Sequence, residues 1–368
     1  MTQEKSLYPN LVNDYFRGIV VNIVEKLNGK NNEQALSYLF REMLREEYSV
    51  TGKWEAINIM NTRVSADYVS MDASLPLKRR DSMGKVSGDI VKSGMELWLS
   101  ETQLTELDTM ISQNISEAEI AAKLFVDTPR VIAGIYELME KSFLQGLSTG
   151  VTVIDDAENT GIGVRLDFGY LDANKFGVSV LWNNVAAKPL NDLRRALKKA
   201  KGDGNTISDV YMDDVTFENF VATQQVKEYF AFSIGFIGNT DIVPTPTLEK
   251  INAALKVDNR YKFTIHIVDR TVINEKNGVR KTVTPWDEGK VILTTSKEVG
   301  VLTYARLAEQ NHPVDAVSYQ MAGNFILVSK YRQNKPSLSE WTSSQARVVP
   351  VICNVEQIYS IDAKMIQA

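Results

Sequence analysis

Apolar residues recur at every third or fourth position in the first part of the chain, over residues 11–28 and 34–47. This spacing is the period of an amphipathic α-helix, so we expect two short helices before residue 50. From residue 55 the sequence AINIMNTRV alternates and is rich in β-branched side chains, which is typical of a strand.

Residues 66–94 are poor in large apolar side chains and rich in glycine and serine. Within them, the stretch LPLKRRDSMGKVSGD carries the cationic residues Lys78, Arg79, Arg80 and Lys85. Compact domains seldom contain so long a segment without regular structure unless it serves a function. We therefore expect an extended, charged excursion at this point.

A helical region follows, opened by Ser100 and Gln103, whose spacing is that of a capping box at a helix start. Residues 101–147 show no strand-like alternation, and Thr128-Pro129 supplies a second N-cap with proline at the first helical position. We expect a long, interrupted helix that lies along a sheet.

Short strands are expected next, at 151–156, 163–171 and 177–182, separated by turn residues. Because they are consecutive, we expect them to form one antiparallel sheet. Residues 187–205 then indicate a helix, with an acidic residue near the start, basic residues near the end and a glycine stop. The segments DVYMD and VTFENFVATQQ repeat the order of strand, then helix.

The clearest hairpin joins residues 262–273 to 278–283, because the Asn277-Gly278 pair readily adopts the positive φ angles of a tight turn. Residues 290–293 add another strand. The final segment, ARVVPVICNVEQIYSIDAKMI, is apolar enough to return into a core. Pro350 within it predicts an edge strand or a break, since proline cannot donate to a strand ladder.

The composition is that of a globular protein able to bury a sizeable core, with 368 residues, 44% hydrophobic and 24% charged. One large domain or a few smaller ones fit this length. The net charge of -5 argues against a protein whose main task is to neutralise phosphates, so any DNA contact should be local. No secretory signal and no run of about 18 apolar residues occurs, so we expect a cytosolic chain without a membrane span.

Catalytic and metal-binding motifs are missing from the sequence. The histidines, His266 and His312, stand in no metal-ligand spacing, and the single cysteine, Cys353, forbids an intrachain disulfide or a cysteine-cluster zinc site. We expect His266 to occupy a sheet position with a satisfied ring, and Cys353 to be a small buried side chain. The sequence therefore predicts no enzymatic activity, no cofactor and no metal.

Three aspartate motifs have structural explanations that outweigh chemical ones. Asp167-Phe168-Gly169 spells the magnesium-binding triplet of protein kinases, but the chain lacks HRD, a VAIK-type lysine and a GxGxxG loop. The pairs Asp155-Asp156 and Asp213-Asp214 could share a proton or a metal. Each lies at an expected strand end or turn, where aspartate is common for backbone reasons.

The basic segment 75–89 allows three interpretations: a phosphate loop, a nucleic-acid arm or a contact for another protein. A phosphate loop is excluded, because no Ser or Thr follows Gly84-Lys85 and no glycine stands at the required position before it. A DNA arm stays open on charge alone, although the cationic stretch has no aromatic residue for stacking and the chain is acidic.

In the order and spacing of its segments, the chain resembles the tailed-bacteriophage major capsid proteins of the lambda head type. The resemblance covers most of the chain and is strongest in LSYLFREMLREEYSVTGKWEAINI, VDRTVINEKNGVRKTVTPWDEGKVILTT and ARVVPVICNVEQIYSIDAKMIQA. It implies an α+β fold with an N-terminal arm, an extended hairpin called the E-loop, a peripheral domain with a long spine helix, and an axial domain. The implied boundaries are 1–60 for the arm, 61–100 for the E-loop, 101–185 for the spine helix and peripheral sheet, 186–345 for the axial domain, and 346–368 for closing strands of the peripheral domain.

The same resemblance implies self-assembly through pentamers and hexamers into the icosahedral head that encloses phage double-stranded DNA, without sequence-specific binding. Cations of the E-loop region would then contact acidic residues of a neighbouring subunit; they are Lys78, Arg79, Arg80, Lys85 and Lys92. The implied partners are other copies of the chain, together with decoration, scaffolding and portal proteins. The implied location is the virion, after assembly in the host cytoplasm.

Alternatives from other classes stay open at this point. An encapsulin-type compartment uses the same fold to enclose protein cargo, and a DNA-binding protein would use residues 78–92. A cytosolic enzyme is disfavoured by the missing His and Cys constellations. Some capsid relatives carry lysine-asparagine isopeptide bonds, for which Lys78, Lys85 and Lys92 are conceivable donors, but the sequence assigns no cross-link.

Overall fold

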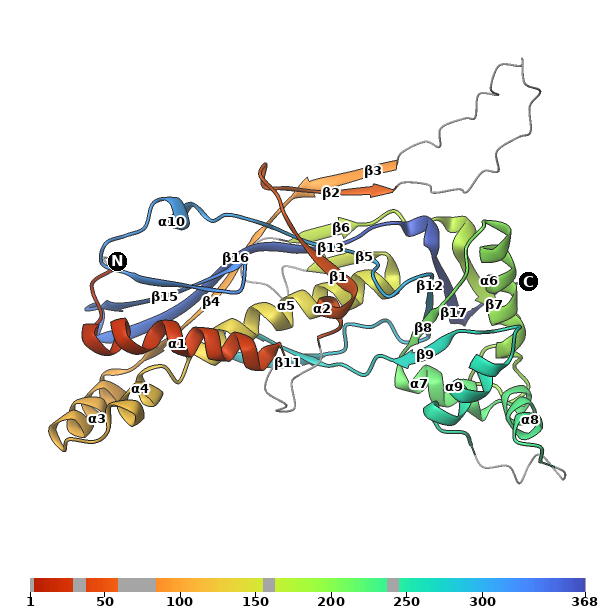
Figure 1. Cartoon of the computed structure of the whole chain (residues 1–368), viewed down its shortest axis with the longest axis horizontal. Coiled ribbons are helices and arrows are strands. Elements are labelled where there is room, and N and C mark those ends of the chain that lie inside the picture. The colour runs from red at the N-terminus through yellow and green to blue at the C-terminus, as the bar shows by residue number, and fades with distance from the viewer. Residues whose placement is uncertain (1–2, 29–37, 59–83, 155–162, 237–244, 368) are drawn as a thin grey trace, which may run out of the picture.

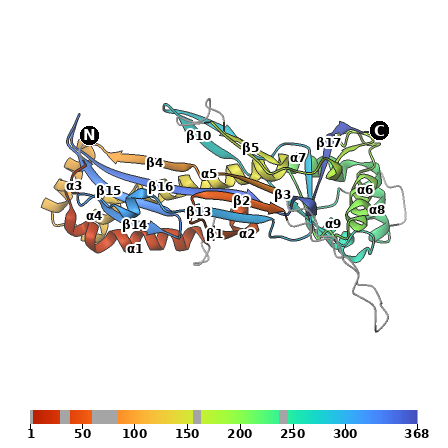
Figure 2. The ribbon, with the colours of Figure 1, turned by 90° about the horizontal axis from the view of Figure 1, so that it is seen from above.

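The computed structural model describes residues 3–28, 38–58, 84–154, 163–236 and 245–367, and shows an elongated molecule (Figure 1). One long helix runs along the molecule, and a sheet with several helices stands at one end of it (Figures 1 and 2). The helices are α1 (Pro9–Leu27), α2 (Leu39–Met43), α3 (Glu101–Ser112), α4 (Glu117–Leu124), α5 (Thr128–Thr149), α6 (Pro189–Gly202), α7 (Asp214–Ala222), α8 (Gln224–Ser233), α9 (Leu248–Val257) and α10 (Ala308–Asn311). The strands are β1 (Leu44–Tyr48), β2 (Lys53–Asn58), β3 (Gly84–Asp89), β4 (Lys92–Leu99), β5 (Val151–Ile154), β6 (Val164–Asp167), β7 (Lys175–Val178), β8 (Asp209–Met212), β9 (Thr264–Ile267), β10 (Val272–Lys276), β11 (Val279–Val283), β12 (Lys290–Thr294), β13 (Gly300–Ala305), β14 (Ser318–Ala322), β15 (Ile326–Gln333), β16 (Ser339–Ile352) and β17 (Ile358–Ile366).

The helices α3, α4 and α5 form the interrupted helix that the sequence predicted. The backbone N–H of Ser100 donates to Gln103 Oε1 over 2.9 Å, as the capping box requires. The long helix α5 begins at Thr128, with Pro129 in its first turn. It ends at Thr149, and the φ of +80° at the next residue, Gly150, lets the chain leave the helix in the left-handed conformation.

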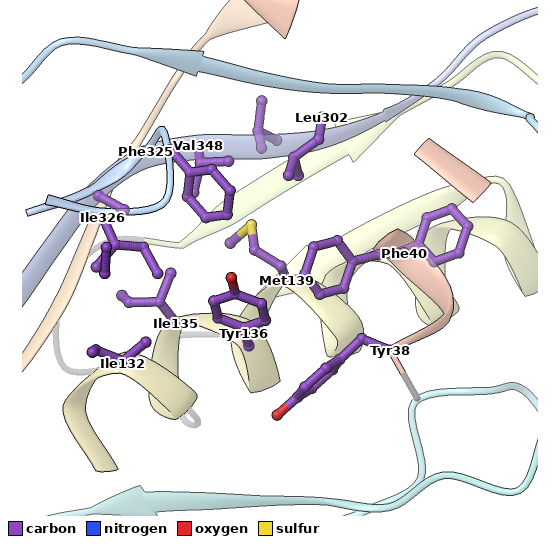
Figure 3. Packing of buried hydrophobic residues seen from close by; sticks show 14 of the residues in the cluster. Tyr38, Phe40, Ile132, Ile135, Tyr136, Met139, Leu302, Phe325, Ile326 and Val348 are labelled. Carbon is purple, nitrogen blue, oxygen red and sulfur yellow. The ribbon is translucent and has the colours of Figure 1, made fainter. Parts of the chain in front are cut away.

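The helix α5 packs on a six-stranded sheet with the order β1-β13-β16-β15-β14, in which β4 also pairs with β16. Figure 3 shows Ile135 and Met139 of α5 on the side of the helix that faces the sheet residue Val348, and each of these side chains is at most 3% exposed. Burial of an apolar side chain of this size contributes about 1.5–3 kcal/mol. The apolar stripe of α5 therefore joins the helix firmly to the sheet.

Pro350 lies in β16, opposite Leu302 of β13. The ladders of β16 with β15 and β4 stop at Ala346 and Arg347, so among the described strands Pro350 has a ladder partner on one side only. The missing N–H of proline is tolerated at such a place. The predicted edge position is thus confirmed. The first half of β16 has neighbours on both sides, whereas the second half, with Pro350, has one on one side only.

A second sheet has the order β7-β17-β12-β8-β9 and packs with α6, α7, α8 and α9 around its own core. Leu193 of α6, Phe220 of α7 and Ile251 of α9 are fully buried in this core. The predicted helix over 187–205 is α6, and the predicted strand and helix that follow it are β8 and α7.

The expectation of one antiparallel sheet from 151–156, 163–171 and 177–182 is wrong in its third strand. β5 and β6 pair antiparallel, but β7 lies in the second sheet, parallel to β17. The amide of Asn174, just before β7, donates to the carbonyls of Glu356 and Ile358 over 3.2 Å each. These long-range bonds hold the segment beside β17, and consecutive position in sequence does not reveal them.

The expected helix over 34–47 is also shorter than predicted. Within its described part, α2 ends at Met43, and residues 44–48 form β1, which runs parallel to β13. The Glu140 carboxylate accepts the N–H groups of Leu39 and Phe40 over 3.0 Å each, which places the start of α2 against α5. Pairing with β13 overrides the helical spacing after that turn.

The predicted hairpin is confirmed over β10 and β11, which pair antiparallel. Its first strand is shorter than predicted, because residues 264–267 form β9, which pairs parallel with β8 in the second sheet. Asn277 and Gly278 have φ angles of +51° and +77°, as the tight turn requires.

Polar contacts join α5 to the N-terminal segment and to residues that flank strands of the second sheet. Glu137 Oε1 accepts from Arg270 Nη2 over 2.6 Å and from the Tyr38 hydroxyl over 2.9 Å, and Arg270 also stacks over the Tyr38 ring. Farther along α5, Ser148 Oγ accepts the N–H of Asp287 over 3.2 Å. The N-terminal segment, the long helix and the second sheet are thereby connected.

We predict that Gly300→Ala destabilises the protein strongly. A Cβ at Gly300 would lie 2.0 Å from the Val351 carbonyl oxygen, so the β13–β16 ladder would have to shift. The control is Gly18→Ala in α1, where a Cβ meets nothing within 4 Å and better helix propensity should stabilise by about 0.5–1 kcal/mol. Urea denaturation of the unassembled protein should give midpoints that move in opposite directions, and equal midpoints would refute the close approach.

We predict that the buried Lys330 makes stability depend on pH. Its Nζ donates to Leu124 O and to Thr342 Oγ1 over 3.1 Å each, and burial lowers its pKa from 10.5 to about 8. The folded state therefore binds this proton less tightly than the unfolded state does. The contribution of Lys330 to the free energy of unfolding is present at high pH and is lost as pH falls through about 8. Relative to Lys330→Met, the free energy of unfolding of the wild type should rise by up to about 1.4 kcal/mol per pH unit between pH 8 and 10. A difference that stays flat over this range would contradict the assignment.

Candidate subunit interface

A two-stranded hairpin, β2 and β3, projects from the body of the molecule (Figure 1). Its strands pair antiparallel from Lys53 opposite Asp89 to Asn58 opposite Gly84. No other described strand pairs with either of them, so both outer edges present backbone groups. Such edges can accept a strand from another chain.

The indole of Trp54 attaches the base of the hairpin to the body. Trp54 is 3% exposed, and its ring lies 6.3 Å from the ring of Phe168, centroid to centroid. Gly88 stands opposite Trp54, where a Cβ would lie 2.7 Å from the indole Nε1. The absence of a side chain at Gly88 thus leaves room for the indole.

The guanidinium of Arg347 connects the residues just before β2 and just after β3, at the base of the hairpin. Its Nη2 donates to the carbonyls of Gly52 and Ile90 over 3.3 and 3.5 Å, and the N–H of Ile90 donates to Gly52 O over 3.0 Å. Gly52 has φ +71°, and a Cβ there would lie 2.6 Å from Nη2. The hairpin therefore leaves the body from a hydrogen-bonded base.

Of the five cations that the sequence singled out, the structure describes Lys85 and Lys92. Lys78, Arg79 and Arg80 lie outside the described residues. Lys85 lies on β3 opposite Ile57, whereas Lys92 lies on β4 opposite Arg347 in the six-stranded sheet. Lys92 Nζ is 3.9 Å from Glu309 Oε1, and because both side chains are substantially exposed this pair contributes little to stability.

Sequence reasoning missed an exposed apolar patch on α8, α9 and the residues after α8. Phe232, Ile234 and Val257 are 84%, 56% and 85% exposed, beside a groove of about 710 Å³. Exposed apolar groups gathered in this way mark interaction surfaces. The signal was present in the sequence, as the alternation of apolar and small residues in AFSIGFIG after the predicted helix.

The residues considered for chemistry have structural roles in the described chain. His266 Nε2 lies 2.7 Å from Asp209 Oδ1, and its ring stacks on Tyr211, so the predicted satisfied position in a sheet is confirmed. Asp213 accepts the N–H of Thr216 as the N-cap of α7. Burial raises the pKa of the Cys353 thiol to about 11, which disfavours the reactive thiolate.

The remaining aspartate motifs are described only in part. Asp167 Oδ1 accepts the N–H of Gly169, a turn contact, and Asp155-Asp156 lies outside the described residues. Among the described residues, no group of three or more His, Cys, Asp or Glu side chains could hold a metal ion. No described helix is both long and apolar enough to cross a bilayer.

Comparison with known proteins identifies the class. The profile of the family described as phage major capsid protein E matches residues 117–363, well over half of the chain. The long helix and most strands of the two sheets lie within the matched residues, and the chain is thus a structural protein of the phage capsid. The chain belongs to the phage major capsid protein E family, so the encapsulin alternative is not favoured.

Solved structures of low sequence identity share the fold. The assigned capsid protein of a prophage in Escherichia coli CFT073 is 11% identical, with a TM-score of 0.57 over 94% of this chain and 98% of that one. A phage-related protein from Bordetella bronchiseptica RB50 is 11% identical, with a TM-score of 0.51 over 95% and 98%. No curated protein matches in sequence. The predicted α+β capsid fold is confirmed.

We predict that Arg347→Met loosens the base of the hairpin. Without the guanidinium, the carbonyls of Gly52 and Ile90 lose their common donor. The hydrogen bond from the Ile90 N–H to Gly52 O should then open more often, and the Ile90 amide should exchange with deuterium at least tenfold faster. The control is Arg45→Met, which removes an exposed cation 3.7 Å from Glu47. Equal protection of Ile90 in both variants would show that Arg347 does not hold the base.

Proposed function

We propose that this shell protein assembles through pentamers and hexamers into an icosahedral head that encloses phage double-stranded DNA, and that it carries no catalytic site. The observation that supports this best is the β2–β3 hairpin, whose base is fixed by Trp54 and Arg347 while its outer edges lack strand partners in the described structure. Closed shells join copies through heterologous contacts, in which one patch binds a different patch on a neighbour. A projection with a fixed base suits such a contact.

We propose a domain division that follows the family resemblance, with an arm over 1–60, an E-loop over 61–100 and a peripheral domain from residue 101. Sheet membership bears on the later boundaries. β13 to β16 lie in the sheet that packs on α5, whereas β17 lies in the second sheet with α6. This favours an axial domain built from residues 175–294 together with β17, in place of 186–345, and assigns 300–352 to the peripheral domain.

We propose that Lys78, Arg79, Arg80 and Lys85 meet acidic side chains of a neighbouring copy, with Lys92 near the base of the same projection. The helices α3 and α4 expose acidic residues of the required kind, among them Glu101 and Glu119. Arginine suits this role because its guanidinium can bind a carboxylate through two parallel hydrogen bonds. Each contact is weak alone, but many per subunit multiply through effective concentration.

Decoration, scaffolding and portal proteins are further proposed partners, and the host cytoplasm is the proposed site of assembly. The acidic chain suits a container for packed DNA, because a strongly basic wall would hold the genome too tightly for packing and release. A dedicated DNA-binding role for residues 78–92 is the alternative that the test below addresses.

Negative-stain imaging of the chain expressed alone tests the proposal. Icosahedral shells, or rings of five and six subunits, are the expected result. A dispersed monomer that retards DNA would favour the DNA-binding alternative, and a dispersed monomer that does not would refute shell formation by this chain alone.

We predict that Arg79→Glu with Arg80→Glu abolishes shell formation while the monomer keeps its far-ultraviolet circular dichroism. The reversed charges would repel the carboxylates of the neighbouring copy. The matched variant, Arg79→Lys with Arg80→Lys, keeps the charge and should still form shells, in reduced yield because lysine binds carboxylates through a single point of contact. Normal shells from the charge-reversed variant would rule out this contact.

A further inference from the structure

A basic groove of about 780 Å³ lies in the second-sheet region, between α6 and the turn that joins α9 to β9. Its described lining includes six cationic side chains and no carboxylate. The cations are Arg194, Arg195, Lys198, Lys201, Arg260 and Lys262. Such a concentration of positive charge stands out in a chain whose net charge is -5.

Four of these cations have no carboxylate in reach. Arg195 lies 4.0 Å from Asp192, and Arg260 forms a close pair with Asp258, with Nη2 to Oδ2 at 2.6 Å. No described carboxylate oxygen lies within 4 Å of the remaining four, which are Arg194, Lys198, Lys201 and Lys262. Their charge is therefore available to a ligand.

The helical cations form a row along one face of α6. Arg194, Lys198 and Lys201 are four and then three residues apart, which places them on the same side of the helix, about 10 Å from first to last at 1.5 Å per residue. Attraction to the helix dipole accounts for a basic residue in the last turn, such as Lys201. It does not account for Arg194, which lies in the middle of α6.

The turn on the other side of the groove has an unusual backbone. Lys262 has φ +54°, a left-handed conformation that glycine or asparagine normally takes. The carboxylate of Asp258 is held by the Arg260 side chain and by the backbone N–H of Arg260, whose side chain holds the pKa of that carboxyl down to about 2. The turn is therefore ordered, with its one acidic group neutralised.

The neutral polar groups of the groove add hydrogen-bond donors. Asn191, Asn205 and Asn259 contribute side-chain amides, and Thr206 contributes a hydroxyl. Asn205 already donates to the Tyr359 hydroxyl over 2.9 Å, whereas no described protein group accepts from the side chains of the other three. Donors of this kind, together with ammonium and guanidinium groups, are those that bind phosphate oxygens.

We propose that this groove binds the phosphate groups of a polyanion, either the backbone of DNA or a small polyphosphate. DNA as the ligand depends on the proposed function, in which the shell encloses a genome. Phosphates rise about 3.4 Å apart along each DNA strand, so the row on α6 spans about three of them. An acidic face of a second copy is the competing occupant, which the test below separates from a polyanion.

Fluorescence anisotropy with a labelled 20-base-pair DNA duplex, and competition by inorganic tripolyphosphate, test the proposal on the full chain. The groove variant is Arg194→Gln with Lys198→Gln and Lys201→Gln. The matched control, Lys256→Gln with Lys281→Gln and Lys335→Gln, removes the same charge from exposed positions outside the groove and the hairpin. Negative-stain imaging of the same preparations reports shell formation separately, so loss of assembly and loss of phosphate binding are distinguished.

The groove variant should bind the duplex at least tenfold more weakly at low salt, and the slope of log K against log salt should fall by about 2 to 3, at roughly 0.9 per lost contact. The control should keep the wild-type slope apart from a small change. Binding of tripolyphosphate without binding of the duplex would support phosphate recognition with a small-molecule source. Three results would each overturn the proposal. They are an equal loss of affinity in the groove variant and the control, no binding of either probe by the wild type, and unchanged binding with loss of shells in the groove variant. The last would favour a subunit contact.

Discussion

The packing of α5 against the six-stranded sheet is the interaction on which the rest of the structure depends. Its apolar stripe, with Ile135 and Met139, supplies the contact, and Ser344 Oγ of β16 donates to the Val131 carbonyl within it. Because one rigid helix carries these contacts, the elements attached to it keep a fixed relation to one another.

Hydrogen bonds to side chains of α5 position three other parts of the molecule. Glu140 holds the start of α2, Glu137 meets Arg270 at the end of β9, and Ser148 meets Asp287 before β12. The buried carboxylate of Glu140 has a raised pKa because burial penalises its charge more than its two backbone donors favour it. The arm, the sheet that bears the hairpin and the second sheet are thus all held against α5.

Signals that are local in sequence predicted much of this fold. The capping box at Ser100, the Asn277-Gly278 turn and the edge position of Pro350 each depend on one residue type in one backbone conformation. The parallel pairs of β1 with β13 and of β7 with β17 were missed, because their partners lie far away in sequence. Local periodicity cannot register such a partner.

The candidate interface was predicted only in part, for the same reason. A charged excursion was visible in the sequence, but its anchors were not, since Phe168 and Arg347, which hold the hairpin base, lie far from it in sequence. The basic groove likewise combines α6 with a turn about 60 residues later, and the sequence explained the α6 lysines by the helix dipole alone.

The central claim is that each subunit uses its hairpin to hold a neighbour. A cryo-electron microscopy reconstruction of assembled shells tests it most directly, by showing where residues 59–83 lie. The account predicts that these residues contact an adjacent copy, with Arg79 and Arg80 beside its carboxylates. A reconstruction in which they fold back onto their own subunit, without reaching a neighbour, would contradict it.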